Sequence, residues 1–420
     1  MDKIRLAIVG CGGMGHRHLK GVGELDHQGL SRFDLVAACD PNRANAESLA
    51  DEAEALLGTR PEVVTDLDQL EQVGVDAIDV PTTPRFHHTI AIDAIERGWH
   101  CMIEKPVGLT VRACNLIAAA AKDRSQIVSV AENYRRDPMN RLARALLDAG
   151  VIGDPRLLLH HSLGGNGNNM IISVWRHQKN QSGLLLDVGV HFTDMMEYLL
   201  GDITTVYAQT RLHEKVRYNP AARGEESKSN PSGVYGKWQK EMPAEFEATA
   251  EDAAYATLTF SSGAVGQYVE DHAIHGDGSW LRQIQGSSGS MTLPPDRKGA
   301  PLSVNVSGKR IEGDDVLDLV PDFRLNEATA KLFGGERLGR FQFEFPEIDR
   351  KIIATEYADF GDAIANGRPP EVDIIHGTRS VAIAYAMMES GLSGEIVSVD
   401  DVIAEKVDAY QAEINQDMKI

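Results

Sequence analysis

Two carboxylates and one imidazole recur at helical spacing in the segment from Gly183 to Leu200. If this segment is helical, Asp187, His191 and Asp194 occupy positions i, i+4 and i+7 and share one face. An otherwise apolar helix gains nothing by burying such groups unless they serve a site. Because imidazole titrates near neutral pH, His191 is suited to take the proton from a hydroxyl group. The pattern therefore predicts proton transfer, in which Asp187 orients the imidazole or holds a second hydroxyl.

Two other interpretations of these three residues stay open. His and Asp side chains at this spacing can ligate zinc, but the face carries one histidine, and the sequence has neither H-E-x-x-H nor a CxxC pair. A histidine buried for purely structural reasons is the second alternative. We therefore predict no metal site.

A lysine follows the apolar segment His100 to Ile103, which reads as a strand, in the sequence Glu104-Lys105-Pro106. Doubly wound sheets bind their ligands at the carboxyl ends of the strands. An ammonium group placed there can hold a substrate hydroxyl and lower the barrier to its deprotonation. On spacing alone, a surface turn is the preferred interpretation of this tripeptide.

The segment Gly10 to Gly15 fits the pattern G-x-G-x-x-G and lies between a predicted strand and a predicted helix, the context that a dinucleotide-binding turn requires. Gly10 permits the tight turn, Gly12 lets the backbone approach a pyrophosphate, and Gly15 lets helix and strand pack closely. The helix N-terminus then offers unpaired N–H groups to the phosphates. A glycine turn without a ligand is the alternative.

An acidic residue, Asp40, ends the second predicted strand, where such a side chain hydrogen-bonds the adenosine ribose. A carboxylate at this position repels a 2′-phosphate, so the sequence predicts NAD rather than NADP. Arg43 argues against this preference for NAD, because its guanidinium can swing towards a 2′-phosphate.

The elements that must position these residues divide the chain into two domains, 1–132 and 133–420. In the first, short apolar strands alternate with helical patterns, which predicts a doubly wound parallel sheet, a Rossmann domain. The expected strands are Lys3–Gly10, Asp34–Asp40, Val75–Val80, His100–Ile103 and Ile127–Val130, and the expected helices are Met14–Val22, Asn42–Leu57, Pro84–Arg97 and Val111–Lys122.

The second domain has a different order of elements, because its predicted strands follow one another without helices between them. Helices are expected at Arg141–Ala149 and Leu186–Leu200, and the strands Ala253–Phe260 and Ala264–Glu270 flank a hairpin tip. This order predicts an α+β domain with a largely antiparallel open sheet. Two polar, Gly/Pro-rich segments, 218–243 and 294–350, are expected to be solvated loops, substrate lids or oligomer arms. Closing helices within 356–390 are expected to pack back towards the first domain.

Composition narrows the class of protein. The chain has 420 residues, of which 42% are hydrophobic and 25% charged, and its formal charge is −20. A surface this acidic argues against nucleic-acid and membrane-surface binding. The longest apolar runs fall short of the roughly 18 residues that a membrane helix needs. Four cysteines without a CxxC pair predict a reduced, cytoplasmic protein.

Together these motifs resemble the glucose–fructose oxidoreductase and inositol dehydrogenase superfamily (Gfo/Idh/MocA). The resemblance runs nearly end to end. Besides the motifs above, it includes Thr83-Pro84 with His88, Asn133-Tyr134-Arg135, Trp175-Arg176, Leu200-Gly201 and Gly367-Arg368-Pro369-Pro370.

The resemblance implies hydride transfer between NAD(P) and a secondary hydroxyl of a sugar, polyol or glycoside, and a homo-oligomer formed through the second domain's sheet. It implies Lys105, Asp187 and His191 as catalytic residues. The expected cofactor-binding residues are Gly10, Gly12, Gly13, Met14, Gly15, Asp40, Arg43, Thr82, Pro84, His88, Glu104, Lys105 and Asn133. The expected substrate-binding residues are Lys105, Arg135, Trp175, Arg176, Asp187 and His191.

The chain departs from the family pattern at three places. Arg85 replaces an asparagine common after Thr–Pro, Ser182 replaces one glycine before Asp187, and the two polar segments make the chain longer than typical members. None of these touches the three catalytic residues, so they put the substrate in question and not the reaction. Two alternative functions remain: internal redox recycling with tightly bound NAD, and a non-catalytic NAD-binding regulator.

Overall fold

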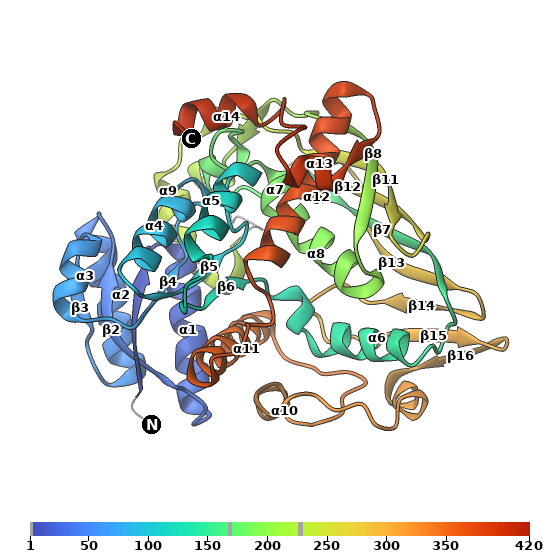
Figure 1. Ribbon diagram of the computed structural model, residues 1–420, viewed down its shortest axis with the longest axis horizontal. Helices are drawn as coiled ribbons and strands as arrows, with labels where there is room; N and C mark the ends of the chain where they lie inside the picture. The colour runs from blue at the N-terminus through green and yellow to red at the C-terminus, as the bar shows by residue number, and fades with distance from the viewer. Residues whose placement is uncertain (1–2, 167–169, 226–229) are drawn as a thin grey trace. The chain divides into compact units, whose positions relative to one another are not determined.

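The computed structural model describes residues 3–166, 170–225 and 230–420, so that part of the predicted loop 218–243 lies outside the described residues (Figure 1). The chain forms two compact units. The first comprises Met1–Asn133 and Pro346–Thr378, and the second comprises Tyr134–Phe345 and Arg379–Ile420.

The first unit is built on a six-stranded parallel sheet in the order β3-β2-β1-β4-β5-β6. This is the doubly wound order, with its switch point between β1 and β4, and it confirms the predicted fold class. The sequence analysis missed β3, whose three residues are too few to show a pattern. The strands are β1 (Ile4–Val9), β2 (Phe33–Cys39), β3 (Glu62–Val64), β4 (Ala77–Val80), β5 (His100–Glu104) and β6 (Val128–Ala131).

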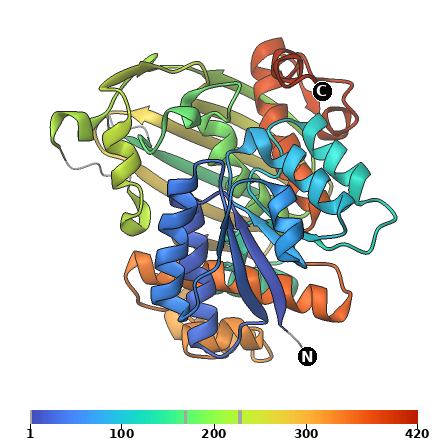
Figure 2. The same ribbon diagram turned by 90° about the vertical axis from the view of Figure 1, so that its left-hand side faces the viewer.

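Helices cover both faces of this sheet (Figure 2). Side chains cap several of them, for example Asn42 on α2 and Thr110 on α5. Helix α1 begins differently, because its N-cap is Gly12, which has no side chain to cap it. The helices are α1 (Gly13–His27), α2 (Arg43–Leu57), α3 (Leu67–Val73), α4 (Pro84–Glu96) and α5 (Val111–Ala121), joined by most of α11 (Phe345–Asn366) and the start of α12 (Ile374–Ser393).

The second unit contains a nine-stranded sheet in the order β16-β15-β14-β13-β7-β12-β11-β8-β17. Strands β7 and β12 run parallel, and the other described neighbours are antiparallel, as the sequence predicts. The predicted hairpin is present between β11 and β12, whereas the long central strand β7 was missed. The strands are β7 (Pro155–Gly165), β8 (Ile203–Arg211), β11 (Ala253–Phe260), β12 (Val265–Ile274), β13 (Ser279–Gly286), β14 (Gly289–Leu293), β15 (Ser303–Val306), β16 (Lys309–Glu312) and β17 (Val397–Ser398).

Helices α6 (Pro138–Asp148), α7 (Leu184–Asp187) and α8 (Gly189–Leu200) lie on one side of this sheet (Figure 1). The single helix predicted over Leu186–Leu200 is wrong in one respect, because α7 and α8 are separate pieces that meet at Val188. A Cβ on Gly189 would lie 3.1 Å from Glu270 Oε2 and 3.2 Å from Tyr268 Oη. The chain thus approaches the sheet too closely there for a larger residue.

The described residues of the two polar segments include short helices and strands. The first holds η3 (Pro220–Arg223), η4 (Pro231–Gly233) and α9 (Gly236–Glu241), and the neighbouring strands β9 (Val216–Tyr218) and β10 (Glu245–Glu247) pair with each other. The second supplies β15 and β16, then η5 (Gly313–Leu319) and α10 (Glu327–Phe333). After α12 the chain continues through β17, α13 (Val399–Ile403) and α14 (Ala412–Met418), which the sequence analysis did not predict. Across the described ranges, no helix is long and apolar enough to span a bilayer.

Candidate active site

The three glycines of the G-x-G-x-x-G turn have different structural surroundings. Gly10 has a φ of +110°, and a Cβ there would lie 2.7 Å from Thr82 Cγ2. A Cβ on Gly15 would lie 2.3 Å from the carbonyl oxygen of Gly10. A Cβ on Gly12, in contrast, would meet no atom within 4 Å. The fold itself therefore requires Gly10 and Gly15, whereas the space beside Gly12 is open to a ligand.

Asp40 connects the end of β2 to the glycine turn. Its side chain is 9% exposed, and its two carboxylate oxygens accept the N–H groups of Cys11 and Asn42, each at 2.8 Å. A carboxylate oxygen can accept more than one hydrogen bond, so a ribose contact remains compatible with this arrangement. Arg43 begins α2, where its exposed guanidinium pairs with Glu47 on the same helix at 3.0 Å.

Polar groups gather after the strands that run towards the same sheet edge. Thr82 and Pro84 follow β4, Lys105 follows β5, and Asn133 follows β6. Within the described part of the chain, buried Nδ1 of His88 on α4 and buried Oδ1 of Asn133 have no hydrogen-bond partner. Since an unpaired buried polar atom costs about 1–3 kcal/mol, these atoms fit a site completed by a polar ligand such as a dinucleotide.

A buried cluster lies beside Lys105, and the sequence analysis missed it. His18 on α1 contacts Asp79 Oδ2 through Nδ1 at 2.9 Å and Glu104 Oε1 through Nε2 at 3.3 Å. Tyr357 on α11 donates its hydroxyl proton to Asp79 at 2.6 Å. Burial by itself lowers the pKa of His18, but the two carboxylates together raise that pKa well above its ordinary value. The cluster fixes Glu104, and with it the start of the Glu104–Lys105–Pro106 turn.

A second missed histidine, His87, joins two of the ligand-edge loops. Its Nδ1 lies 2.9 Å from the carbonyl oxygen of Pro106, and its Nε2 lies 3.2 Å from that of Thr82. Complete burial lowers the pKa of His87. The signal was present in the sequence, because His87 lies beside His88 in the first turn of a helix that begins with Thr83-Pro84.

The peptide bond between Lys105 and Pro106 is cis.

His191 lies in the first turn of α8, in the second unit, and is 6% exposed. Its imidazole stacks on the ring of Tyr134, with centroids 4.1 Å apart and planes within 2° of each other. Flat stacking of this kind holds the plane of the imidazole.

Asp187 ends α7 and is held by an arginine. Nε of Arg176 donates to Asp187 Oδ2 at 3.0 Å, and Nη1 of Arg176 donates to Ser173 Oγ at 2.8 Å. The guanidinium lies over the ring of Trp175, 4.1 Å from its centroid. The structure thus brings together three residues that were predicted to bind substrate.

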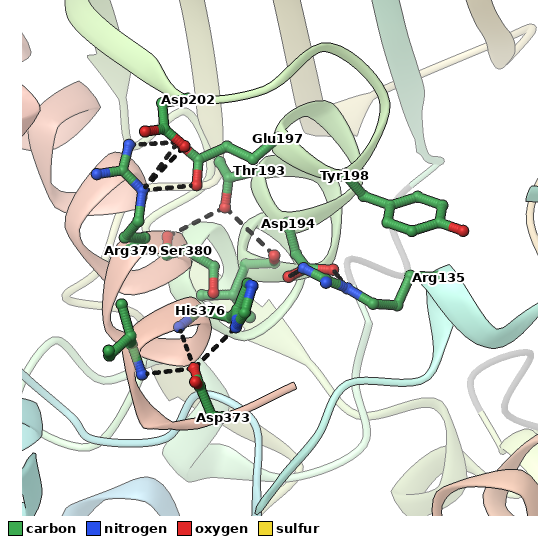
Figure 3. A network of polar contacts seen from close by, with 12 residues as sticks. Arg135, Thr193, Asp194, Glu197, Tyr198, Asp202, Asp373, His376, Arg379 and Ser380 are labelled. Atoms are coloured by element: carbon green, nitrogen blue, oxygen red, sulfur yellow. Dashed lines mark hydrogen bonds and ion pairs between the residues drawn. The ribbon is translucent and has the colours of Figure 1, made fainter. Parts of the chain in front are cut away.

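The third carboxylate of the helical pattern, Asp194, pairs with Arg135 inside the fold (Figure 3). Nε of Arg135 donates to Asp194 Oδ2 at 2.9 Å, and Nη2 contacts the other oxygen. Further along α8, Arg379 donates to Glu197 at 2.9 and 2.6 Å. These pairs fix the helix that carries His191, and a substrate contact of Arg135 stays a prediction. Lys105 belongs to the first unit, and Asp187 and His191 belong to the second.

No cluster of three or more His, Cys, Asp or Glu side chains suited to a metal ion occurs in residues 3–166, 170–225 and 230–420.

Two family models match the chain. One, described as the NAD-binding Rossmann fold of an oxidoreductase family, matches residues 4–132, and the other, described as the C-terminal alpha/beta domain of that family, matches residues 144–399.

Curated relatives cover the chain almost completely. Levoglucosan dehydrogenase of Pseudarthrobacter phenanthrenivorans is 28% identical to this chain, and the alignment covers 96% of this chain and 100% of that enzyme. The scyllo-inositol 2-dehydrogenase (NAD(+)) of Bacillus subtilis is 25% identical, with coverages of 95% and 97%. Among solved structures, an oxidoreductase domain protein from Kribbella flavida aligns with a TM-score of 0.75 at 24% identity, covering 95% of this chain and 100% of that one. At this identity the structural likeness establishes the fold.

Proposed function

Because the chain belongs to the Gfo/Idh/MocA oxidoreductase family, with an NAD-binding Rossmann domain at 4–132, we propose that it oxidises a secondary hydroxyl of a sugar, polyol or glycoside. The names of the relatives support this substrate class, since they include a levoglucosan, an inositol and a D-glucoside dehydrogenase. The observation that carries the proposal within this chain is the buried, ring-stacked His191 on a helix fixed by two arginine–carboxylate pairs.

Each of the three catalytic residues has a separate task in this proposal. A nicotinamide cofactor held at the glycine turn and Asp40 would supply the hydride acceptor for this oxidation. His191 accepts the hydroxyl proton, so that the C–H electron pair and the O–H proton leave in one oxidation and a carbonyl forms. Lys105 holds the reacting oxygen with its ammonium group. Asp187, whose orientation Arg176 fixes, accepts a hydrogen bond from a neighbouring substrate hydroxyl.

We assign NAD as the preferred cofactor. Asp40 brings a carboxylate to the end of β2, and the ion pair with Glu47 holds the Arg43 guanidinium on its own helix. Both features favour a ribose diol over a 2′-phosphate.

The reaction takes place in the cytoplasm according to this proposal. All four cysteines are free and buried, which suits a reducing compartment.

We further propose that the protein forms a homo-oligomer through the face of the nine-stranded sheet opposite α6, α7 and α8. Residues paired across β8, β11 and β12 share this face, among them Tyr207, Tyr255 and Val265, which are 44%, 37% and 40% exposed. These exposed apolar side chains support the choice of this face as the association surface.

The direct test is a substrate panel that contains levoglucosan, scyllo-inositol, glucosides and free sugars, with reduction of NAD as the readout. His191→Ala should lower kcat by about 10²–10⁴-fold while NAD affinity, measured by calorimetry, stays near wild type. Lys105→Ala should lower kcat and also raise KM, because its contact exists in the ground state as well. An inactive wild-type protein on the whole panel, or wild-type kcat in His191→Ala, would contradict the proposal.

A further inference from the structure

The long polar segment 294–350 reaches the residue that stacks on the proposed base. The Arg297 guanidinium lies over the Tyr134 ring, with Cζ 4.9 Å from the ring centroid, and its Nη2 donates to Tyr134 Oη at 3.4 Å. The same Tyr134 ring stacks on the His191 imidazole. A cation, a phenol ring and an imidazole therefore form one contiguous series within the second unit.

Arg297 is anchored at its backbone. Its N–H donates to Asp137 Oδ2 at 2.7 Å, and Asp137 Oδ1 accepts the N–H of Met139 at the start of α6. Burial raises the pKa of Asp137 to about 6, although these N–H groups and the charge of Arg297 oppose the shift.

The residue before it, Asp296, is anchored as well. Its Oδ1 accepts hydrogen bonds from Arg282 Nη1 at 2.6 Å and from Asn140 Nδ2 at 2.7 Å. The side chains of Arg282 and Asp296 are 1% and 3% exposed. Such a buried, hydrogen-bonded pair leaves little freedom to the backbone that enters Arg297.

The backbone at Arg297 itself is strained. Its φ is +57°, in the left-handed region that residues other than glycine rarely adopt. This conformation costs about 1–3 kcal/mol and persists only where the surroundings impose it, which happens most often beside functional sites. Glycine would adopt the same conformation without strain, so the arginine side chain is the feature to explain.

We propose that Arg297 is a positioning residue for His191. By lying over the Tyr134 ring it keeps that ring flat against the imidazole, and it thereby fixes the plane in which the imidazole meets the substrate hydroxyl. The inference rests on the proposed function, because it takes His191 as the base. A poorly placed catalytic group costs about 10²-fold in rate, even when every reacting atom is present. The segment 294–350 would in this way contribute Arg297 to the proposed site.

Three variants of Arg297 test the assignment, with kcat, the KM of a substrate found in the panel, and NAD affinity as readouts. Arg297→Gln should lower kcat about 10–100-fold while NAD affinity stays at the wild-type value. Arg297→Lys keeps a cation over the ring and should recover part of the loss. Arg297→Gly suits the backbone conformation and should keep the thermal midpoint of the wild type while losing as much kcat as Arg297→Gln.

A double-mutant cycle separates positioning from general damage. In a His191→Ala background, Arg297→Gln should cause no further loss of rate, because the residue acts through His191. Tyr134→Leu should lose more activity than Tyr134→Phe, which keeps the ring. An equal loss in both backgrounds, or unchanged kcat in Arg297→Gln, would overturn the inference. Wild-type kcat in His191→Ala would instead overturn the proposed function, so the two failures are distinguishable.

Discussion

At the scale of single residues, the two carboxylates and the imidazole that the sequence places at helical spacing have different structural surroundings. The spacing of Asp187, His191 and Asp194 indicated a shared site, but it did not show that each carboxylate has its own arginine. Arg176 and Arg135 come from segments outside α8, so helical spacing carries no information about them. His191 differs from both carboxylates, since an aromatic ring covers it. Proton exchange stays the predicted role of the imidazole.

The open space beside Gly12 makes this residue a selective probe of cofactor binding. Gly12→Val should abolish NAD binding in calorimetry while the thermal midpoint stays within a few degrees of wild type, because the new side chain meets no protein atom within 4 Å of its Cβ. Gly15→Ala should instead destabilise the protein, since its Cβ would lie 2.3 Å from the Gly10 carbonyl oxygen.

Gly164→Val is the matched control for Gly12→Val. Its φ likewise lies outside the left-handed region, and a Cβ there also meets nothing within 4 Å, but it lies in β7 of the second unit. NAD affinity should be unaffected by this change. Retained NAD binding in Gly12→Val would show that the glycine turn does not hold the pyrophosphate.

Asp40 should govern the choice between NAD and NADP. Asp40→Asn replaces one carboxylate oxygen with an amide group, which lowers the repulsion towards a 2′-phosphate and weakens the acceptance of ribose hydroxyls. The ratio of kcat/KM for NAD to that for NADP should fall by about 10-fold, corresponding to roughly 1.4 kcal/mol.

Arg43→Ala serves as the comparison for Asp40→Asn. This change should leave the NAD rate unaltered and weaken any residual use of NADP. A wild-type protein that prefers NADP would show that Arg43 outweighs Asp40.

At the scale of elements, the sequence predicts best where periodicity is strong. The five strands predicted in the first domain lie within about two residues of their observed bounds, because buried parallel strands form apolar runs. The helices agree less well, since α1 ends at His27 and not at Val22, and α3 was not predicted. The three-residue strand β3 is too short for such a signal. Strand β7 mixes polar and apolar residues and reads His160-His161-Ser162 at its centre, so its sequence shows no clear strand pattern. It is nevertheless a central strand, paired with β13 on one edge and with β12 on the other. Tertiary pairing, and not local pattern, makes that segment a strand.

The buried contact between α1, β4 and α11 should depend on pH through His18. The pKa of this histidine is raised in the folded protein, whereas it is about 6.5 in an unfolded chain. Its contribution to the free energy of unfolding is therefore fully present below pH 6.5 and is lost as the pH rises through the raised value. His18→Gln should cost about 3–5 kcal/mol at pH 6, because Asp79 and Glu104 lose their buried partner, and less at alkaline pH.

His376→Gln provides the control for this pH dependence. His376 pairs with Asp373 at 2.7 Å, but its side chain is 47% exposed, so its removal should cost less than about 1 kcal/mol. Urea unfolding of both variants from pH 6 to 9 gives the comparison. A cost for His18→Gln that grows with pH would show that the buried histidine is neutral.

At the scale of the whole molecule, two opposed tendencies bear on the proposed self-association. The formal charge of −20 makes copies repel one another at long range. The sheet face that carries Tyr207, Tyr255 and Val265 favours association by burying apolar surface. Salt screens the first effect much more than the second, with a Debye length of about 8 Å at 0.15 M ionic strength. Association through this face should therefore strengthen as salt is added.

A double substitution on the sheet tests the proposed oligomer. Tyr207→Glu combined with Val265→Glu places new charges opposite Thr257 and Thr259 of β11, where a second copy would have to bury them without partners. The mass measured by light scattering after gel filtration should fall from that of an oligomer to that of the 45.8 kDa monomer. Ile375→Glu is the control, since this side chain is 64% exposed on α12 in the first unit, and it should leave the mass unchanged. The NAD-binding residues of the first unit are untouched by the double change, so NAD affinity should persist in the monomer.

A monomeric wild-type protein at all salt concentrations, or an oligomer that survives the double substitution, would show that this face does not hold the copies together.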